Sequence, residues 1–250
     1  MEKFFSSCSE FKTHKNIVLT INYRQHSNIE HLHYLNKLRR GECDDDSMYA
    51  YFKKRISVAD LHIDPTYTRL IYTNKERNNH NAKMLANIKI KLYTYESAVK
   101  YYNDYIPNEW PFQMPQSVSL KLGAPVLCLR NIQEHDLANG TQGVIIAIDN
   151  NELTLLTRDN KTITQQIETL FDNKRNIIGE CKGMPFTLAY AMTIHKVQGL
   201  TLDKIVIHIN NMQFTWHLFY VALSRAQNIK YVYIITQYPF FKHFLKTITI

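Results

Sequence analysis

The sequence is poor in glycine, proline and cysteine, with seven, seven and four of these among 250 residues. So few glycines and prolines exclude fibrous and low-complexity classes. None of the glycines is followed by Lys-Ser or Lys-Thr, so the phosphate-binding loop G-x-x-x-x-G-K-[ST] is absent. No apolar run approaches the length of a membrane span, and no signal-peptide core follows Met1. The sequence therefore predicts no membrane partner.

The cysteines are widely separated and form no C-x-x-C pair; they are Cys8, Cys43, Cys128 and Cys181. This pattern is typical of reduced thiols inside a cell and not of a disulfide framework. His31 and His33 precede Cys43 and an acidic run at residues 44–46, but the usual spacing of zinc ligands is missing. We therefore predict no metal site.

Hydrophobic residues make up 45% of the chain, which is enough to build a core. Thirty basic side chains against 22 acidic ones leave a net charge of +8. Such an excess suits a polyanionic partner, because basic side chains bind phosphates and release condensed counterions. A basic protein without such a partner would show the same balance, so charge alone does not decide between the two.

Strand and helix signals alternate along both ends of the chain. Residues 17–21 form a short apolar run that predicts a buried strand. Ser27 and Glu30 then fit a capping box at the start of a helix, and Gly41 supplies the stop at the end of that helix. Further helices are expected at residues 48–55, 74–88 and 215–226, and further strands at 68–73, 188–194, 205–209 and 231–236.

The middle of the chain has a different pattern. Residues 101–116 are rich in proline and predict an irregular loop. Short strands joined by Asn- and Asp-rich turns follow, at residues 126–129, 143–148, 153–157 and 162–167. We therefore expect an α/β domain with a parallel sheet over residues 1–117 and 186–250, interrupted by a small β-barrel over residues 118–185.

Three segments contain the side chains that a phosphate-bearing ligand needs: residues 22–25, 193–199 and 220–226. Arg24 and Arg225 are planar, permanently charged groups suited to phosphate oxygens. Thr193, His195 and Lys196 are donors that follow a predicted strand, and Gly199 allows close approach of the backbone.

Each of these residues has an ordinary structural alternative. Arg225 alone could form a rim salt bridge, and Arg24 alone is no more specific. His195 alone fits a hydrogen-bonded structural histidine, and Lys196 a solvated side chain. The functional interpretation depends on the combination.

The three segments, in this order, resemble motifs IV, V and VI of superfamily I helicases, particularly the RecD-like and Pif-type branch. Residues 35–42, 72–74, 122–126 and 139–143 resemble the intervening parts of the same family. The resemblance therefore covers nearly the whole chain. It implies a RecA-like parallel sheet flanked by helices, with a small inserted SH3-like β-barrel, in the second half of such a helicase.

The resemblance also implies roles for individual residues. Arg225 would be the arginine finger and Arg24 a second sensor of the γ-phosphate of ATP. Gln198, Gly199 and Thr201 would lie near the nucleotide, although many relatives outside this branch have Glu in place of Thr201. The backbone of single-stranded DNA would be held by Thr193, His195, Lys196, Thr73 and Asn74.

For the whole enzyme the resemblance implies ATP-driven 5′-3′ translocation on single-stranded DNA or at DNA forks, in replication, repair or recombination. ATP and Mg²⁺ would be held mainly by a first RecA-like domain with a P-loop, in a longer chain or a separate subunit. This chain alone is expected to be inactive. The expected location is a reducing compartment at the site of DNA replication: nucleus, cytoplasm or viral factory. The alternative is a non-catalytic nucleic-acid-binding accessory module derived from a helicase.

Overall fold

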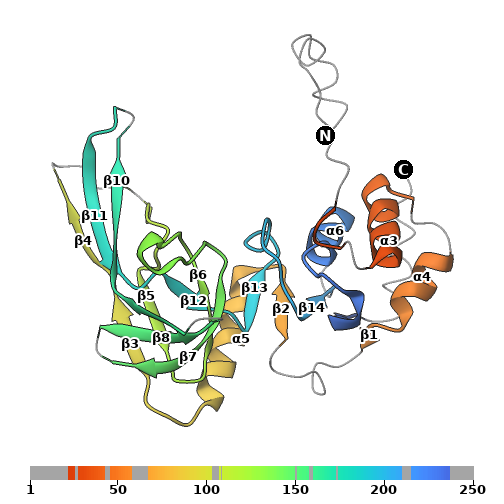
Figure 1. Cartoon of the computed structure of the whole chain (residues 1–250), viewed down its shortest axis with the longest axis horizontal. Helices are drawn as coiled ribbons and strands as arrows, with labels where there is room; N and C mark the ends of the chain where they lie inside the picture. Colours follow the sequence, from red (N-terminus) through yellow and green to blue (C-terminus); the bar gives the residue numbers. More distant parts are fainter. Residues whose placement is uncertain are drawn as a thin grey trace.

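A computed structural model describes residues 22–25, 28–42, 46–57, 67–102, 107, 109–149, 151–157, 160–172, 174–209 and 215–236. The strand predicted at residues 17–21 and Ser27 lie outside these ranges. The described part forms two units joined by one helix (Figure 1). One unit is built on a parallel sheet, and the other consists of antiparallel strands.

The parallel sheet has the strand order β1-β15-β14-β2-β13. Its strands are β1 (Ile56–Ser57), β2 (Thr68–Ile71), β13 (Ala191–Thr193), β14 (Ile205–His208) and β15 (Val232–Ile235). All of the pairings in it are parallel. The neighbouring strands β14 and β15 are mostly apolar because helices or loops cover both faces of such a sheet, whereas β2 begins with the buried Thr68 and Arg69. The predicted α/β class with a parallel sheet is therefore confirmed.

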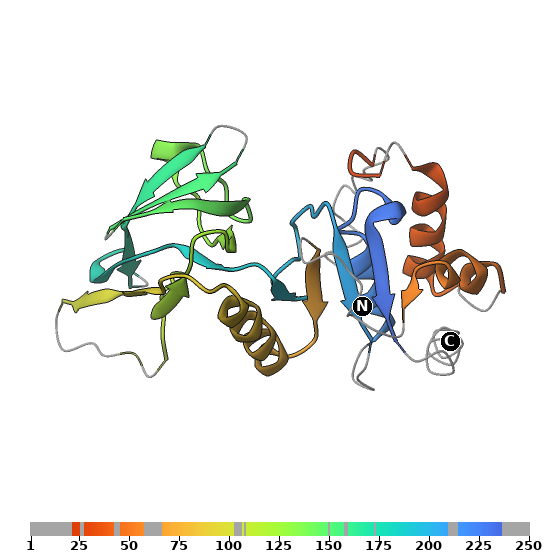
Figure 2. The same ribbon diagram turned by 90° about the horizontal axis from the view of Figure 1, so that it is seen from below.

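Three helices pack beside this sheet: α3 (Ile29–Arg40), α4 (Asp46–Lys53) and α6 (Trp216–Leu223). They share a core with the strands, in which Phe52, Phe219 and Ile207 are fully buried. A short 3₁₀ helix, η3 (Ile229–Tyr231), leads into β15. Figure 2 shows α3 and α4 at the end of the molecule remote from the antiparallel unit.

The predicted helix after residue 28 is confirmed, but its first cap is not Ser27. Asn28 is the N-cap, and its side chain accepts a hydrogen bond from the His31 backbone N–H. Asn and Ser are both favourable caps, so adjacent candidates are hard to rank from sequence. At the other end Gly41 adopts a left-handed conformation with φ of 75°, as predicted for the stop.

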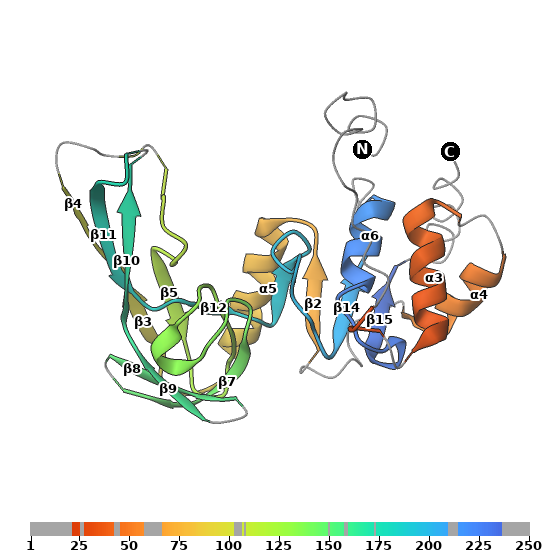
Figure 3. The same ribbon diagram turned by 45° about the horizontal axis from the view of Figure 1, so that its top comes forward.

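Helix α5 (Asn74–Asn87) joins the two units, and it begins one residue earlier than Asn74, the cap expected from the sequence, would allow. Thr73, not Asn74, is the N-cap: its hydroxyl accepts from the Glu76 N–H, and the Glu76 carboxylate accepts from the Thr73 N–H. This reciprocal pair is a capping box. Figure 3 shows α5 standing between β2 and the antiparallel unit.

The antiparallel unit is inserted between β2 and β13, which are neighbours in the parallel sheet. Its main sheet has the order β12-β6-β7-β8-β9, and it encloses a separate core that includes Leu120, Leu153 and Phe186. The strands are β6 (Pro125–Cys128), β7 (Gln142–Ile148), β8 (Glu152–Leu156), β9 (Lys161–Thr164) and β12 (Phe186–Leu188), with a 3₁₀ turn η2 (Gln133–His135).

Two smaller sheets extend this unit. β10 (Gln166–Phe171) and β11 (Ile177–Gly183) form a hairpin that pairs with β4 (Ala98–Tyr101), while β3 (Tyr93–Glu96) pairs with β5 (Ser117–Leu120). The described residues 109–116 contain no helix or strand, in agreement with the loop predicted at residues 101–116. β4 includes the first residue of that predicted loop, Tyr101.

The strand pairings extend the inserted unit beyond the predicted range of residues 118–185. Residues Tyr93–Tyr101 pair within it, and so does β12. The strand predicted at residues 188–194 is confirmed in part: β13 lies within this range and pairs parallel with β2, whereas Leu188 ends β12, which pairs antiparallel with β6. A continuous apolar run concealed this change of partner. Likewise, the strand expected at residues 162–167 divides into β9 and β10.

Candidate functional site

Arg24 lies where two distant segments of the chain meet. Its Nε donates to Thr201 Oγ1 at 2.9 Å, and its Nη1 donates to the Ser224 carbonyl at 3.1 Å. A longer contact of 3.4 Å joins Nη2 to the Gly199 carbonyl. The guanidinium is thereby oriented by partners in the loop after β13 and at the end of α6.

Gln25 stabilises the same junction from inside. Only 2% of this residue is exposed, and its Nε2 donates to the carbonyls of Ser224 and Ala226 at 3.0 and 2.8 Å. Buried amides of this kind need both partners, because an unpaired polar group in the interior is costly. Sequence reasoning assigned no role to Gln25, although the residue stands directly after Arg24.

Arg225 follows α6 and lies beside Arg24. Its Nε donates to the Val221 carbonyl at 3.0 Å, its Nη2 to Ser224 Oγ at 2.8 Å and its Nη1 to the Leu200 carbonyl at 3.4 Å. Burial lowers the pKa of Arg225, and the positive charge of Arg24 lowers it further. Among the described residues no carboxylate forms an ion pair with either guanidinium. Two cations held together in this way favour an anion between them.

The loop between β13 and β14 brings backbone and side-chain groups to this arginine pair. Gly199 has a φ of +92°, a conformation that residues with a side chain rarely adopt. Its carbonyl and the Thr201 hydroxyl both accept from Arg24. Gln198 is exposed on the same loop. The structure therefore brings Arg24, Arg225, Gly199 and Thr201 together.

A second group of predicted residues follows the carboxyl end of β13. Thr193 is buried, with 5% of its surface exposed, whereas His195 and Lys196 are exposed. The His195 ring lies 6.3 Å from the ring of Tyr72, which follows β2. Partial desolvation lowers the pKa of Lys196, and the charge of Arg77 lowers it further. Because β2 and β13 are parallel, their carboxyl ends meet at one edge of the sheet.

Thr73 and Asn74 occupy the same edge at the start of α5. The Thr73 hydroxyl donates to Glu76 Oε2 at 2.7 Å, so it is engaged within the helix cap. Asn74 is exposed. The structure therefore places the two predicted groups for nucleic acid, after β13 and after β2, next to each other at the sheet edge.

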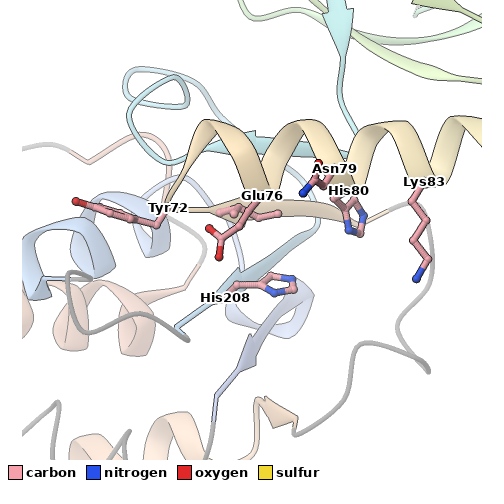
Figure 4. Close-up of a pocket in the computed structure, with 7 residues that line it drawn as sticks. Tyr72, Glu76, Asn79, His80, Lys83 and His208 are labelled. Atoms are coloured by element: carbon pink, nitrogen blue, oxygen red, sulfur yellow. The ribbon is translucent and has the colours of Figure 1, made fainter.

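A cavity of about 320 Å³ adjoins the first turns of α5. Its polar lining comes from Tyr72, Glu76, Asn79, His80 and Lys83, with His208 at the end of β14. Figure 4 shows the α5 side chains on the side of the helix that faces His208. None of the residues predicted from the sequence to bind a ligand lines this cavity.

Comparison with known proteins shows that the chain is similar to DNA helicases. Residues 110–148 match the 2B domain of the DNA helicase Pif1. The ATP-dependent DNA helicase Pif1 of Campylobacter jejuni is 30% identical over 234 residues, which are 86% of this chain and 52% of that protein.

Two solved structures of Bacteroides Pif1 show the same fold. The complex with ADP-AlF4 superposes with a TM-score of 0.69 at 26% identity, over 86% of this chain and 50% of that one. The complex with single-stranded DNA gives 0.64 at 25% identity, over 92% and 56%. The chain thus spans about half the length of the relatives it matches.

A parallel sheet with an antiparallel unit inserted between neighbouring strands, and an arginine pair at a loop junction, define the class of the fold: a RecA-like α/β domain with an inserted unit, as in the solved Pif1 helicases. Within that class the chain is related to the Pif1-type helicases, by sequence over most of its length and by fold. The match is consistent with their C-terminal half. In the described part no helix is long and apolar enough to cross a membrane.

Proposed function

We propose that the chain is the C-terminal half of an ATP-dependent DNA helicase that moves 5′ to 3′ along single-stranded DNA. The observation that carries the proposal is the convergence of Arg24 and Arg225 with Gly199 and Thr201, from three segments far apart in sequence. A structural arginine is usually paired with a carboxylate, and no described carboxylate pairs with these two.

The roles we assign follow from that geometry. Arg225 is the arginine finger, and Arg24 is the second group that recognises the γ-phosphate of ATP. Their charges stabilise the negative charge that develops on the transferred phosphoryl group. Gly199 and Thr201 orient Arg24, and Gln198 is placed to contact the nucleotide from the exposed side of the loop.

ATP and Mg²⁺ supply the phosphoryl group and the metal charge that bridges its oxygens. No P-loop occurs in the 250 residues, so we assign the phosphate cradle and the Mg²⁺ ligands to another RecA-like domain. That domain belongs to a longer chain or to a partner subunit. The residues of this chain then act across the interface between the two domains, in the manner of an arginine finger supplied from outside.

The sheet edge formed by β2 and β13 is the proposed contact with single-stranded DNA. Lys196 and His195 are exposed there, and Asn74 lies beside them. Thr193 lies at the end of β13 and contributes through its backbone groups. Thr73 follows β2 and contributes as the N-cap of α5. Polar and cationic groups of this kind hold the sugar-phosphate backbone without reading the base sequence. DNA forks are a natural substrate for such a translocating machine.

We also propose that the protein works in replication, repair or recombination of DNA, in a reducing compartment. Cys128 and Cys181 are buried thiols in the described part, which supports a reducing environment. The nucleus, the cytoplasm and a viral factory all satisfy this condition.

The decisive test is the Arg225→Ala variant in the complete enzyme. A finger contributes a factor of roughly 10³ to 10⁵ to turnover, so DNA-stimulated ATP hydrolysis should fall by that amount. Arg40→Ala, which removes an exposed arginine from the end of α3, is the matched control and should keep full activity. If Arg225→Ala stays within a few-fold of the unmodified enzyme, the finger assignment is wrong.

The absence of a P-loop favours one alternative, a non-catalytic module that only binds nucleic acid. ATP hydrolysis should be measured with the chain alone and after mixing it with a candidate P-loop domain. Activity that appears only in the mixture supports the split helicase. No activity in either case, together with tight and salt-sensitive binding of single-stranded DNA, supports the binding module.

A further inference from the structure

A buried amide links helix α5 to β13. Asn81 Oδ1 accepts from the Ala191 N–H at 2.7 Å, and its Nδ2 donates to the Ala191 carbonyl at 3.0 Å. Only 6% of Asn81 is exposed. β13 is the last strand of the parallel sheet, so this side chain replaces the backbone partner that a further strand would supply.

Arg77 lies one helical turn before Asn81, on the same side of α5. α5 starts at the carboxyl end of β2 and passes the beginning of β13 at Asn81. The turn that contains Arg77 therefore lies toward the residues that follow the carboxyl end of β13, among them Lys196. In agreement with this placement, the charge of Arg77 helps to lower the pKa of Lys196.

The Arg77 guanidinium has no acidic partner among the described residues. It donates from Nε and Nη2 to Asn78 Oδ1, at 3.1 and 2.7 Å. Burial lowers the pKa of Arg77 as well. Two partly desolvated cations, one of which lowers the pKa of the other, without a carboxylate ion-paired to Arg77, form a site that an incoming anion stabilises.

A groove of about 280 Å³ continues from Arg77 between α5 and the antiparallel unit. α5 contributes Arg77, Asn78 and Asn81, while hydroxyls come from β5 and β12; they belong to Ser117, Ser119 and Thr187. None of the residues that line it is acidic. The groove therefore has one cationic side chain, Arg77, and its remaining lining is made of neutral polar and apolar side chains.

We propose that Arg77 binds the phosphate next to the one held by Lys196, and that this groove carries the single-stranded DNA backbone from the sheet edge toward β5. The inference rests on the proposed function, because it extends the same DNA path. Hydroxyl and amide groups suit a sugar-phosphate backbone, which they contact without base specificity. Because no acidic side chain lines the groove, the DNA phosphates would meet no repulsion from carboxylates there.

The test uses a matched pair of variants on α5. Asn78→Asp places a carboxylate on the atoms that already bind the Arg77 guanidinium, and so neutralises it with almost no change of shape. Asn79→Asp makes the same change of charge at the next residue, which faces the cavity of Figure 4 on the opposite side of the helix. Arg77→Gln removes the same amount of charge directly, and Arg77→Lys keeps it.

Binding of a fluorescein-labelled oligothymidine to the full chain is measured by anisotropy over a range of salt concentrations. Each phosphate contact contributes about 0.7 to the slope of log K against log salt for single strands. Arg77→Gln and Asn78→Asp should both weaken binding several-fold at low salt and reduce the slope by about 0.7. Asn79→Asp and Arg77→Lys should keep the slope of the unmodified chain. If Arg77 acted only by supporting the structure, the slope would not follow the charge at this position in this way.

The outcomes separate the two levels of the proposal. If Lys196→Gln weakens binding but Arg77→Gln and Asn78→Asp behave like Asn79→Asp, the groove is not part of the DNA path and the sheet-edge contact stands. If the unmodified chain does not bind the oligonucleotide, or Lys196→Gln leaves binding unchanged, the DNA contact under the proposed function is itself overturned.

Discussion

The Nε atom of Arg24 donates a hydrogen bond to Oγ1 of Thr201 over 2.9 Å. This contact ties a loop near the start of the chain to the loop before β14. Thr201 therefore acts on the arginine, and its place near the nucleotide stays a prediction. A hydroxyl that fixes a guanidinium prepares it to meet a charge, since less reorganisation is needed when the ligand arrives.

Replacing Thr201 by Val tests this positioning role. The side chain keeps its shape but loses the acceptor for Arg24, so the guanidinium is no longer fixed at Nε. We expect DNA-stimulated ATP turnover by the complete enzyme to fall about tenfold, the effect of one lost hydrogen bond to a charged group. Thr201→Ser retains the hydroxyl and should keep most of the activity. Binding of single-stranded DNA should be the same in both variants, because Thr201 binds Arg24 and is not among the residues that we assign to the DNA contact.

The Asn81 amide is expected to dominate the attachment of α5 to the sheet. Asn81→Leu keeps the volume but leaves the N–H and carbonyl of Ala191 without their partner. The free energy of unfolding should fall by about 3 kcal/mol, the cost of buried unpaired backbone groups. Urea denaturation measures this change. Asn79→Leu, on the opposite side of the helix, should lower it by less than about 1 kcal/mol.

His31 makes stability depend on pH. The ring is fully buried, its Nδ1 lies 3.2 Å from the Tyr51 hydroxyl, and burial lowers its pKa from 6.5 to about 4. A base whose pKa is lower in the folded state is neutral there, so its contribution to stability is complete above pH 6.5 and is lost as the pH falls toward 4.

Unfolding in urea at pH 7, 5.5 and 4.5 measures this loss, which amounts to at most roughly 3 kcal/mol for the shift. His31→Gln should flatten the dependence over this window. His33→Gln, an exposed residue of the same helix, should leave it unchanged. Equal pH profiles for His31→Gln and the unmodified chain would contradict the assignment.

Two glycines with positive φ should differ in their sensitivity to alanine. A Cβ at Gly199 would meet nothing within 4 Å, so only the backbone conformation, with φ of +92°, opposes it. That cost is about 1 to 2 kcal/mol. A Cβ at Gly140, with φ of +90°, would in addition collide with the side chain of Leu200. Gly140→Ala should therefore destabilise the chain more than Gly199→Ala, as measured by their urea midpoints.

Local rules predicted much of the fold from the sequence. The apolar runs at β14 and β15 and the Gly41 stop of α3 are properties of neighbouring residues, and they were correctly recognised. The caps were displaced by one residue because Ser27 and Asn28, or Thr73 and Asn74, are adjacent residues of similar capping strength. Local energies of nearly equal size do not choose between such neighbours.

The strand partners could not be predicted in this way. β12 and β13 lie two residues apart in one apolar run, yet one pairs with β6 and the other with β2. Tyr93–Glu96 joins the inserted unit through β5, which begins only at Ser117. Register and partner depend on contacts between distant segments, which no local pattern contains.

The sequence by itself determined the chemical groups and the order of the motifs, because residue type and spacing are sufficient for both. Arg24, Arg225, Lys196 and Gly199 could be selected on those grounds. Only the tertiary structure decided that Arg24 binds Thr201, that Gln25 binds the Ser224 carbonyl that also accepts from Arg24, and that the charge of Arg77 acts on Lys196. These relationships join residues that lie far apart in the chain, and they exist only once the sheet, α5 and α6 have packed together.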